Sequence, residues 1–396
     1  MAEMQYWVWF QQMFGIGTRR SHLLMEYFPD PQALYEEIRA GGKAGSMLTE
    51  KEKDSCQKAL QQAEQIVQAT YRKTCRILTP QDAEYPALLQ AIYAKPAALY
   101  VKGDLNCLKD KLAIALVGSR DCSEYGAAAA RQLAEGLAEL GVVVVSGLAH
   151  GIDTAAHAAA LAKNGESIGV MGCGIDIDYP SGNREIKSAM RKNGAVISEF
   201  PMGTPVRGPN FPIRNRIISG ISHGVVVVEA AAQSGAVITA QHALEQGREV
   251  FGVPGSIFDA QHCGVHQLLR DGAKLVQQVA DIIEEYPAFG IYLPQERLTA
   301  PHLAQSTVLP APKEPNPPAE AAHLRYDALP GELSEEARKL CMLLDGRSCS
   351  VQALCTESGQ DMGELLAALT ELEIYRLVES LPGRQYRLVR GAAAGG

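Results

Sequence analysis

Six short runs of continuously apolar, largely β-branched residues constrain the fold of this chain more than any other feature. The runs are LAIALVG, VVVVSG, SIGVMG, AVISEF, GVVVVEA and EVFGVPG, all within residues 111–285, and segments of helix length separate them. Strands that are apolar on both faces belong to a parallel sheet covered by helices on each side. In the first spacer, Ala130, Leu133, Leu137 and Leu140 recur on one helical face. The sequence therefore predicts an α/β domain with a Rossmann-like, mainly parallel sheet.

The flanking segments predict further domains. Residues 1–75 are dense in helix formers and carry a Gly-x-Gly turn, FGIG, at 14–17, which predicts a helical domain of the helix-hairpin-helix or SAM-like type. This turn has two possible roles: its backbone N–H groups can bind a DNA phosphate, or the turn can simply pack two helices together. We expect the core domain to span 76–285, a proline-rich, extended linker to span 286–330, and a winged-helix domain to span 331–390.

The expected winged helix has an unusual charge for a DNA-binding module. Residues 331–396 carry seven basic and ten acidic side chains, a net charge of −3, and the helix DMGELLAALTELEI is acidic. Duplex binding by a winged helix normally uses a basic recognition helix, because DNA is a polyanion. We therefore expect this unit to contact protein or to regulate the core domain.

The composition of the whole chain limits the cellular compartment and the binding partners that we expect. The chain has 396 residues and a net charge of −8, which argues against a globally basic surface but permits a local basic cleft. Its nine cysteines include no C-x-x-C pair and no histidine at zinc-finger spacing, so we expect reduced thiols. No stretch approaches the roughly 20 apolar residues that span a bilayer, and the N-terminus lacks a secretion-signal pattern. We predict a cytoplasmic protein without a membrane partner.

The carboxyl ends of the predicted strands are where a ligand is expected. Each strand leads into a turn, several of them rich in glycine and serine, and these turns include VGSR, SGLAHGID, GCGIDIDYP, SEFP, VEAAAQSGA and VPG. In a parallel sheet these turns meet at one edge, beside the crevice where ligands bind. Helix N-termini and exposed backbone N–H groups at such an edge favour anions, above all phosphate.

Cations gather near the same edge. From Ser181 to Arg216 there are seven basic and two acidic residues, a local charge of +5 in an acidic chain. The basic residues are Arg184, Lys187, Arg191, Lys192, Arg207, Arg214 and Arg216, and Arg120 adds a cation in the GSR turn. Lys187, Arg191 and Lys192 fit a solvated helix face equally well. Arg214 and Arg216 belong to FPIRNRIISG, which we place at a strand edge, and one of them can instead pair with Glu199 or Glu229.

Phe211 precedes this arginine pair. An aromatic ring there can stack on an unpaired base, which is worth about 1–3 kcal/mol per base in proteins that bind single strands. A core aromatic before Pro212 is an equally good interpretation of the same residue.

The sequence offers little for catalysis. His150, His157 and His223 occur without a convincing nucleophile, and neither a G-x-S-x-G nor an H-E-x-x-H motif is present. Asp153, with Thr154, is predicted to cap the helix that follows SGLAHGI. Asp176 and Asp178 alone are insufficient for a metal site. We predict a protein that is not an enzyme and has no metal or cofactor.

Seven segments between about residues 80 and 285 resemble the DNA processing protein A (DprA/Smf) family in order and spacing. They are VGSRDCSEYG, VVSGLAHGIDTAAH, GCGIDIDYPSGN, SEFPMGTP, FPIRNRIISG, VVVEAAAQSGAVITAQHALEQGREVFGVPG and GAKLV. Two places differ from the commonest forms. His150 stands where the family often has arginine, which leaves a DNA contact at that position open, and AVITA replaces SLITA after Gly235.

The resemblance implies a protein that binds single-stranded DNA without strong sequence preference. It also implies a homodimer formed through the Rossmann-like domain, which protects incoming DNA and loads the recombinase RecA onto it in natural transformation. By motif, Arg120, Arg214, Arg216 and the backbone near Ser146, Gly147 and Gly151 would hold phosphates. The full set of implied contact residues is Gly118, Ser119, Arg120, Ser146, Gly147, Gly151, Arg184, Arg207, Phe211, Arg214, Asn215, Arg216, Ser234 and Gly235.

Three other functions compete with this interpretation. A nucleotide phosphoribohydrolase of the lysine-decarboxylase-like type would need a P-G-G-x-G-T-x-x-E loop, and this chain has VEAAAQSGAVITA in the comparable region. A dinucleotide-dependent oxidoreductase is suggested only by the sheet, because VGSRDCSEYG departs from G-x-G-x-x-G. A pure protein-interaction scaffold would leave the arginine-rich edge unexplained.

Overall fold

The structure is a computed structural model, and it describes residues 3–291, 333–344, 348–375, 377–381 and 385–389. By its contacts the chain divides into two units, residues 1–301 and 302–396, which are described separately. No helix in the described part of the chain is long and apolar enough to cross a bilayer. The nine cysteines carry free thiols.

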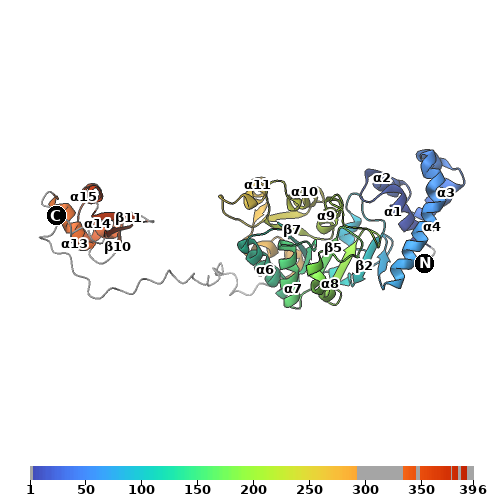
Figure 1. Ribbon diagram of the computed structural model, residues 1–396, viewed down its shortest axis with the longest axis horizontal. Coiled ribbons are helices and arrows are strands. Elements are labelled where there is room, and N and C mark those ends of the chain that lie inside the picture. Colours follow the sequence, from blue (N-terminus) through green and yellow to red (C-terminus); the bar gives the residue numbers. More distant parts are fainter. Residues whose placement is uncertain (1–2, 292–332, 345–347, 376, 382–384, 390–396) are drawn as a thin grey trace. The chain divides into compact units, whose positions relative to one another are not determined.

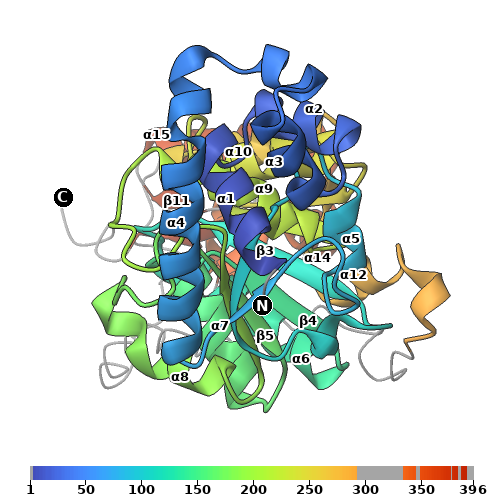
Figure 2. The same ribbon diagram turned by 90° about the vertical axis from the view of Figure 1, so that its right-hand side faces the viewer.

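The first unit begins with four α-helices and one 3₁₀ turn, as the helix-forming composition predicts. They are α1 (Met4–Phe14), α2 (Arg19–Tyr27), α3 (Pro31–Arg39), η1 (Lys43–Met47) and α4 (Glu50–Arg72). The N-termini of α2 and α3 are capped by side chains, and Thr49 and Glu52 form a reciprocal capping box at the start of α4. Figure 2 shows the long helix α4 lying beside α1, where their apolar faces pack together.

The core of this unit is a nine-stranded sheet in the order β1-β2-β6-β5-β4-β3-β7-β8-β9. The strands are β1 (Arg76–Leu78), β2 (Leu99–Gly103), β3 (Ala113–Gly118), β4 (Val143–Ser146), β5 (Ser167–Met171), β6 (Gly194–Ser198), β7 (Gly224–Glu229), β8 (Glu249–Gly252) and β9 (Lys274–Leu275). The seven strands from β6 to β9 are parallel, and β2 and β1 extend the sheet in antiparallel pairings. The predicted Rossmann-like sheet is confirmed.

Helices cover both faces of the sheet, which explains why its strands are apolar throughout. In Figure 1, α6 (Glu124–Glu139), α7 (Ile152–Ala162) and α8 (Arg184–Met190) lie on one side, and α9 (Asn210–Gly220), α10 (Gly235–Glu245) and α11 (Cys263–Arg270) lie on the other. The remaining short elements are α5 (Ala87–Gln90), η2 (Asn106–Leu108), η3 (Ser181–Asn183), η4 (Ala260–His262), α12 (Ala280–Ile283) and η5 (Pro287–Phe289).

The connection between β6 and β7 positions the candidate site. After β6 the chain returns to the middle of the sheet, where β7 pairs with β3. Helix α9 makes this return, so FPIRNRIISG forms a helix and the prediction that it lies at a strand edge is wrong. The order of strands reverses beside β3, and in open α/β sheets such a switch point is where a ligand crevice forms.

The described residues of the second unit form three helices and a three-stranded antiparallel sheet. Its elements are α13 (Glu335–Leu343), β10 (Ser348–Ser350), α14 (Val351–Ser358), α15 (Met362–Ile374), β11 (Val378–Leu381) and β12 (Gln385–Leu388), and the strand order is β10-β12-β11. One apolar cluster, including Leu340, Leu354, Leu369 and Leu372, forms its core. This is the predicted winged-helix arrangement. The predicted linker falls largely in residues 292–332, outside the described residues.

Candidate nucleic-acid interface

An aromatic ring flanked by cations forms the centre of the candidate site. Phe211 lies in the first turn of α9, and its ring contacts the backbone of Gly172 just after β5, where a Cβ atom would come within 3.0 Å of the ring. Its centroid is 5.7 Å from that of Tyr179. The guanidinium carbons of Arg120 and Arg214 lie 4.8 and 5.8 Å from the Phe211 centroid, both within the range of a cation–π contact.

Arg120 is the exposed member of this group. It belongs to the turn between β3 and α6, and among the described residues it has no carboxylate partner. A buried carboxylate fixes that turn, because Ser123 donates both its backbone N–H and its hydroxyl to Glu229. The N–H of Ser119 also donates to the carbonyl oxygen of Glu229, at 2.7 Å. The protein thus holds the backbone of the turn firmly and leaves the Arg120 side chain in solvent.

The turn after β4 is fixed by a second buried carboxylate. Asp153 accepts hydrogen bonds from the N–H groups of Gly147 and Ala149, at 3.1 and 3.2 Å. The prediction that Asp153 caps α7 is therefore wrong, since the N-cap residue is Gly151 and Asp153 bonds to the preceding turn. Gly151 has φ of +74°, and a Cβ there would lie 2.3 Å from the Ser119 carbonyl oxygen, so glycine lets the turns after β3 and β4 touch.

Arg214 is buried beneath this surface. Arg214 is only 3% exposed. Its Nη1 donates to the carbonyl oxygens of Gly147 and Val170, at the ends of β4 and β5. Burial lowers the pKa of Arg214 to about 10, while the nearby charge of Asp153 opposes that change. Arg214 therefore stays protonated near neutral pH. It connects α9 to two strand ends and supports the Phe211 ring.

Arg216 lies on another side of α9 and is also buried. Its Nη2 donates to the carboxylate of Glu199, directly after β6, and the side chains of both residues are less than a tenth exposed. Burial raises the pKa of Glu199, and Arg216 opposes that rise. Gly17, in the Gly-x-Gly turn of the N-terminal helices, packs over the guanidinium: a Cβ there would lie 2.9 Å from Nε of Arg216. The Gly-x-Gly turn therefore packs against the core domain, which agrees with the helix-packing role, one of its two possible roles.

The sequence of residues 76–287 matches the model of the DNA recombination-mediator protein A family, and residues 310–384 match the DprA winged-helix domain. The chain belongs to the DNA recombination-mediator protein A (DprA) family. It is 39% identical to protein Smf of Escherichia coli over 319 residues, 79% of this chain and 78% of that protein. It is 45% identical to DprA of Streptococcus pneumoniae over 202 residues, 51% of this chain and 71% of that protein.

A solved DprA structure supports the fold of the core domain. The X-ray structure of DprA from Streptococcus pneumoniae superimposes with a TM-score of 0.61 and 34% sequence identity, covering 71% of this chain and 97% of that one. The resemblance inferred from the sequence motifs is confirmed, together with the Rossmann-like sheet and the winged-helix domain.

Two of the arginines predicted as phosphate contacts are engaged within the protein. Arg214 and Arg216 were expected to hold phosphates, but both guanidinium groups are buried and bonded within the protein. The alternative in which one of them pairs with Glu199 is confirmed for Arg216. Asn215 between them donates to the carbonyl oxygen of Gly235 and joins α9 to α10.

The remaining cations differ in their freedom to bind a ligand. Arg207 is exposed four residues before Phe211, and within the described ranges no carboxylate pairs with it. Arg184 is exposed but pairs with Asp178, at 2.5 Å. Lys187, for which a solvated helix face was one of two open interpretations, is only 6% exposed and donates to the carbonyl oxygen of Tyr179.

The other predicted contact residues lie at the same edge with internal partners. The hydroxyl of Ser146 is buried and donates to Leu116, and Ser234 caps α10 by accepting from the N–H of Val237. Gly118 packs closely against the side chain of Ile152. Direct DNA contact by Gly118, Ser119, Ser146, Gly147, Gly151, Ser234 and Gly235 stays a prediction.

Two features of the site escaped the sequence reasoning. Tyr179 contacts Phe211, although the motif that contains it was noted only for its glycines and aspartates. The spacing of Phe211 and Arg214 also carried a signal. Residues three apart on a helix share a face, so assigning a helix to FPIRNRIISG would have predicted their contact.

The three histidines considered above for catalysis differ in environment. His157 is fully buried, its Nδ1 lies 2.8 Å from Oγ of Ser167, and burial lowers its pKa to about 3, with Arg214 acting in the same direction. His223 accepts a hydrogen bond from the N–H of Ala113, and His150 is exposed. Within the described residues, no three His, Cys, Asp or Glu side chains are placed to hold a metal ion.

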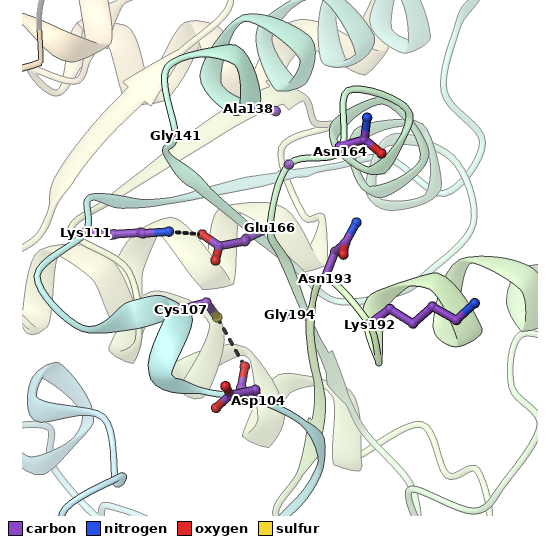
Figure 3. A pocket seen from close by; sticks show the side chains of 11 residues that line it. Asp104, Cys107, Lys111, Ala138, Gly141, Asn164, Glu166, Lys192, Asn193 and Gly194 are labelled. Atoms are coloured by element: carbon purple, nitrogen blue, oxygen red, sulfur yellow. Dashed lines mark hydrogen bonds and ion pairs between the residues drawn. The ribbon is translucent and has the colours of Figure 1, made fainter.

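A cavity of about 430 Å³ lies at the opposite edge of the sheet, where the parallel strands begin (Figure 3). Lys111 and Glu166 form an ion pair across it at 2.5 Å, and the Cys107 thiol donates to the carbonyl oxygen of Asp104. Burial raises the pKa of Cys107 to about 12, so this thiol stays protonated. The two acidic and two basic side chains that line the cavity give it no net charge. Arg120 lies at the other end of the strands.

Proposed function

We propose that this protein binds single-stranded DNA without strong sequence preference at a surface formed by Arg120, Arg207 and Phe211, and that it acts there as a recombination mediator. The observation that carries the proposal is the exposed guanidinium of Arg120 lying 4.8 Å from the half-buried Phe211 ring at the carboxyl edge of the sheet. Arg120, Arg207 and Phe211 are called the arginine–phenylalanine surface below.

The chemistry of this surface favours a single strand. An aromatic ring recognises the face of a base, which is accessible only when the base is not stacked inside a duplex. Every base has such a face, so stacking gives affinity with little sequence preference. The two exposed arginines can then neutralise backbone phosphates beside the stacked base.

The buried arginines serve the same surface indirectly. Arg214 lies against Phe211 and bonds to the ends of β4 and β5, which fixes the ring over Gly172. Arg216 holds α9 against Glu199 and the N-terminal turn. We propose both as positioning residues, so that their loss weakens DNA binding through the placement of Phe211.

We further propose that the protein works in the cytoplasm as a homodimer formed through its Rossmann-like domain. In this role it protects incoming single-stranded DNA, loads RecA onto it during natural transformation, and catalyses no reaction itself. Membership of the recombination-mediator family supports this role over the phosphoribohydrolase alternative. The acidic winged-helix unit is proposed to contact protein or to regulate the core.

The test is fluorescence anisotropy of a labelled oligo-dT at several salt concentrations. Arg120→Ala and Arg207→Ala should each lower the log–log salt slope by about 0.7, the value expected for one lost phosphate contact. Phe211→Ala should weaken binding by about 1–3 kcal/mol and leave the slope unchanged, because stacking releases no counterions. The matched control is Arg191→Ala, an exposed arginine directly after α8, near the opposite edge of the sheet.

The outcomes separate the proposal from its competitors. A folded wild-type protein that fails to bind the oligonucleotide would refute it, and nucleotides would become the ligands to screen. Equal losses in Arg120→Ala and Arg191→Ala would mean that net charge alone drives binding. If the oligonucleotide binds as proposed, RecA filament assembly on the same strand is the next assay, and Arg120→Ala should reduce it.

A further inference from the structure

The loop after β8 carries the most exposed large apolar side chain in the described part of the chain. Phe258 is 93% exposed and its neighbour Ile257 is 79% exposed. Single exposed apolar residues are common on protein surfaces, but two adjacent ones at a loop tip form a small patch. The loop follows a parallel strand, so it belongs to the same carboxyl edge as the turns that carry Arg120 and the β4 end.

Three hydrogen-bond contacts support the backbone of this loop. The N–H of Phe258 donates to the hydroxyl of Ser256 at 3.2 Å, and the N–H of Gln261 donates to the Asp259 carboxylate at 2.9 Å. Nε2 of His266 lies 3.2 Å from the carbonyl oxygen of Gly255, which can only accept. The backbone that carries the apolar tip is therefore supported by these contacts, which lowers the ordering cost when a ligand binds.

Contacts also join the loop to the helix that follows Arg120. The hydroxyl of Tyr125, in the first turn of α6, donates to the carbonyl oxygen of Pro254 at 2.6 Å, and its ring lies 5.8 Å from that of His262. Tyr125 is itself 51% exposed. Phe258 is four residues beyond Pro254, a span of at most about 14 Å of extended chain.

The charge around the tip selects the kind of ligand contact. Residues 254–262 contain no lysine or arginine, and Asp259 is their single acidic residue. Asp121 and Glu124, on the Arg120 side of Tyr125, are exposed as well. Such a surface gives phosphates no electrostatic attraction, so a contact with nucleic acid at this tip would have to come from stacking on an aromatic ring.

We propose that Phe258, with Ile257 beside it, is a second base-stacking site for the strand bound at the arginine–phenylalanine surface. The inference rests on the proposed binding of single-stranded DNA. The strand would pass from Phe211 and Arg120 by way of Tyr125 to the tip, with its bases toward the protein and its phosphates toward solvent, away from Asp121 and Glu124. Only oligonucleotides that extend several bases beyond Phe211 reach Phe258, which gives the site a dependence on length.

The experiment compares oligo-dT of about 6 and about 20 nucleotides, lengths that bracket common single-strand sites of about 4–16 nucleotides. Phe258→Ala should weaken binding of the longer strand about 5-fold to 150-fold, the effect of losing one stacked base, with an unchanged salt slope. Binding of the shorter strand should stay within 2-fold. Phe258→Trp should retain affinity, and Phe258→Leu should lose it, because leucine is apolar but has no aromatic face.

Two controls make the result specific. Tyr27→Ala removes an aromatic side chain that is 72% exposed at the end of α2, and it should change neither affinity. Sedimentation of wild type and Phe258→Ala reports self-association, and the two masses should agree. The inference would be overturned if Phe258→Ala bound both oligonucleotides as tightly as the wild-type protein does. It would also be overturned if Phe258→Ala changed the sedimenting mass and left the DNA affinity unchanged, because the tip would then be a self-association surface.

Failure of the proposed function gives a different pattern. In that case the wild-type protein binds neither oligonucleotide, and Arg120→Ala has no binding to lose. Failure of this inference alone leaves wild-type binding and its loss in Arg120→Ala intact.

Discussion

Replacing Arg216 with methionine tests whether this arginine stabilises the fold or contacts DNA. In the structure its guanidinium is bonded to Glu199, and both side chains are less than a tenth exposed. Methionine is similar in length and apolar, so the variant removes the charge and leaves little empty space. Glu199 would then be buried without a counter-charge, and burial alone would raise its pKa.

The expected size of the effect follows from the protonation of Glu199. An unpaired buried carboxyl group is neutral in the folded protein, whereas in the unfolded chain it titrates near its ordinary pKa of about 4.3. At pH 7 this costs about 1.4 kcal/mol for each of about 2.7 pH units, or about 4 kcal/mol of unfolding free energy. The estimate agrees with the roughly 3–5 kcal/mol found when one partner of a buried pair is removed. At pH 5 the same calculation gives about 1 kcal/mol.

Urea unfolding at pH 7 and pH 5 measures both values. Glu199→Gln combined with Arg216→Met should be more stable at pH 7 than Arg216→Met alone, because the unpaired carboxyl group is gone. Arg184→Met is the matched control, since its ion pair with Asp178 is exposed to solvent and should contribute little to stability. An Arg216→Met protein that unfolds at the wild-type urea concentration at pH 7, yet loses DNA affinity, would refute the structural role and restore Arg216 as a phosphate contact.

Three further predictions follow from buried contacts. Gly147→Ala should unfold at lower urea concentration, because its Cβ would lie about 2.6 Å from Nη1 of Arg214; unchanged stability would show that the two strand ends can move apart. Between pH 7 and pH 4 the unfolding free energy of the wild-type protein should fall by on the order of 3 kcal/mol more than that of His157→Gln. As the pH falls, His157 is protonated in the unfolded chain before it is protonated in the folded protein, because burial lowers its pKa in the fold; parallel pH profiles of the two proteins would contradict this. Gly17→Ala should loosen the N-terminal helices from α9, because φ there is +65° and the new Cβ would meet Arg216, and amide hydrogen exchange of α1 and α2 would report it.

Much of the fold could be predicted from local patterns. Continuous runs such as those ending at Gly118 and Glu229 can be buried on both faces only in a parallel sheet between helices, and the structure has that arrangement. The antiparallel pairing of β2 with β6 could not be predicted, because period and composition do not specify a strand's neighbours.

The arginines of FPIRNR show where local reasoning ends. The sequence indicated cations beside a phosphate-favouring edge, and Arg120 and Arg207 are indeed exposed there. It could not indicate that Arg214 points toward the ends of β4 and β5 while Arg216 points toward Glu199. Two residues apart on a helix, their side chains leave in nearly opposite directions, and both directions meet protein.

The sequence by itself determined the class of the fold, the edge of the sheet where a ligand is expected, and the family to which the chain belongs. These follow from hydrophobic periodicity and from motifs that are contiguous in the chain. Only the tertiary structure decided which cations face solvent, because burial depends on what other segments place over a side chain. Gly17 covers Arg216 from about 200 residues away, while Phe258 stays exposed because no described segment packs on it.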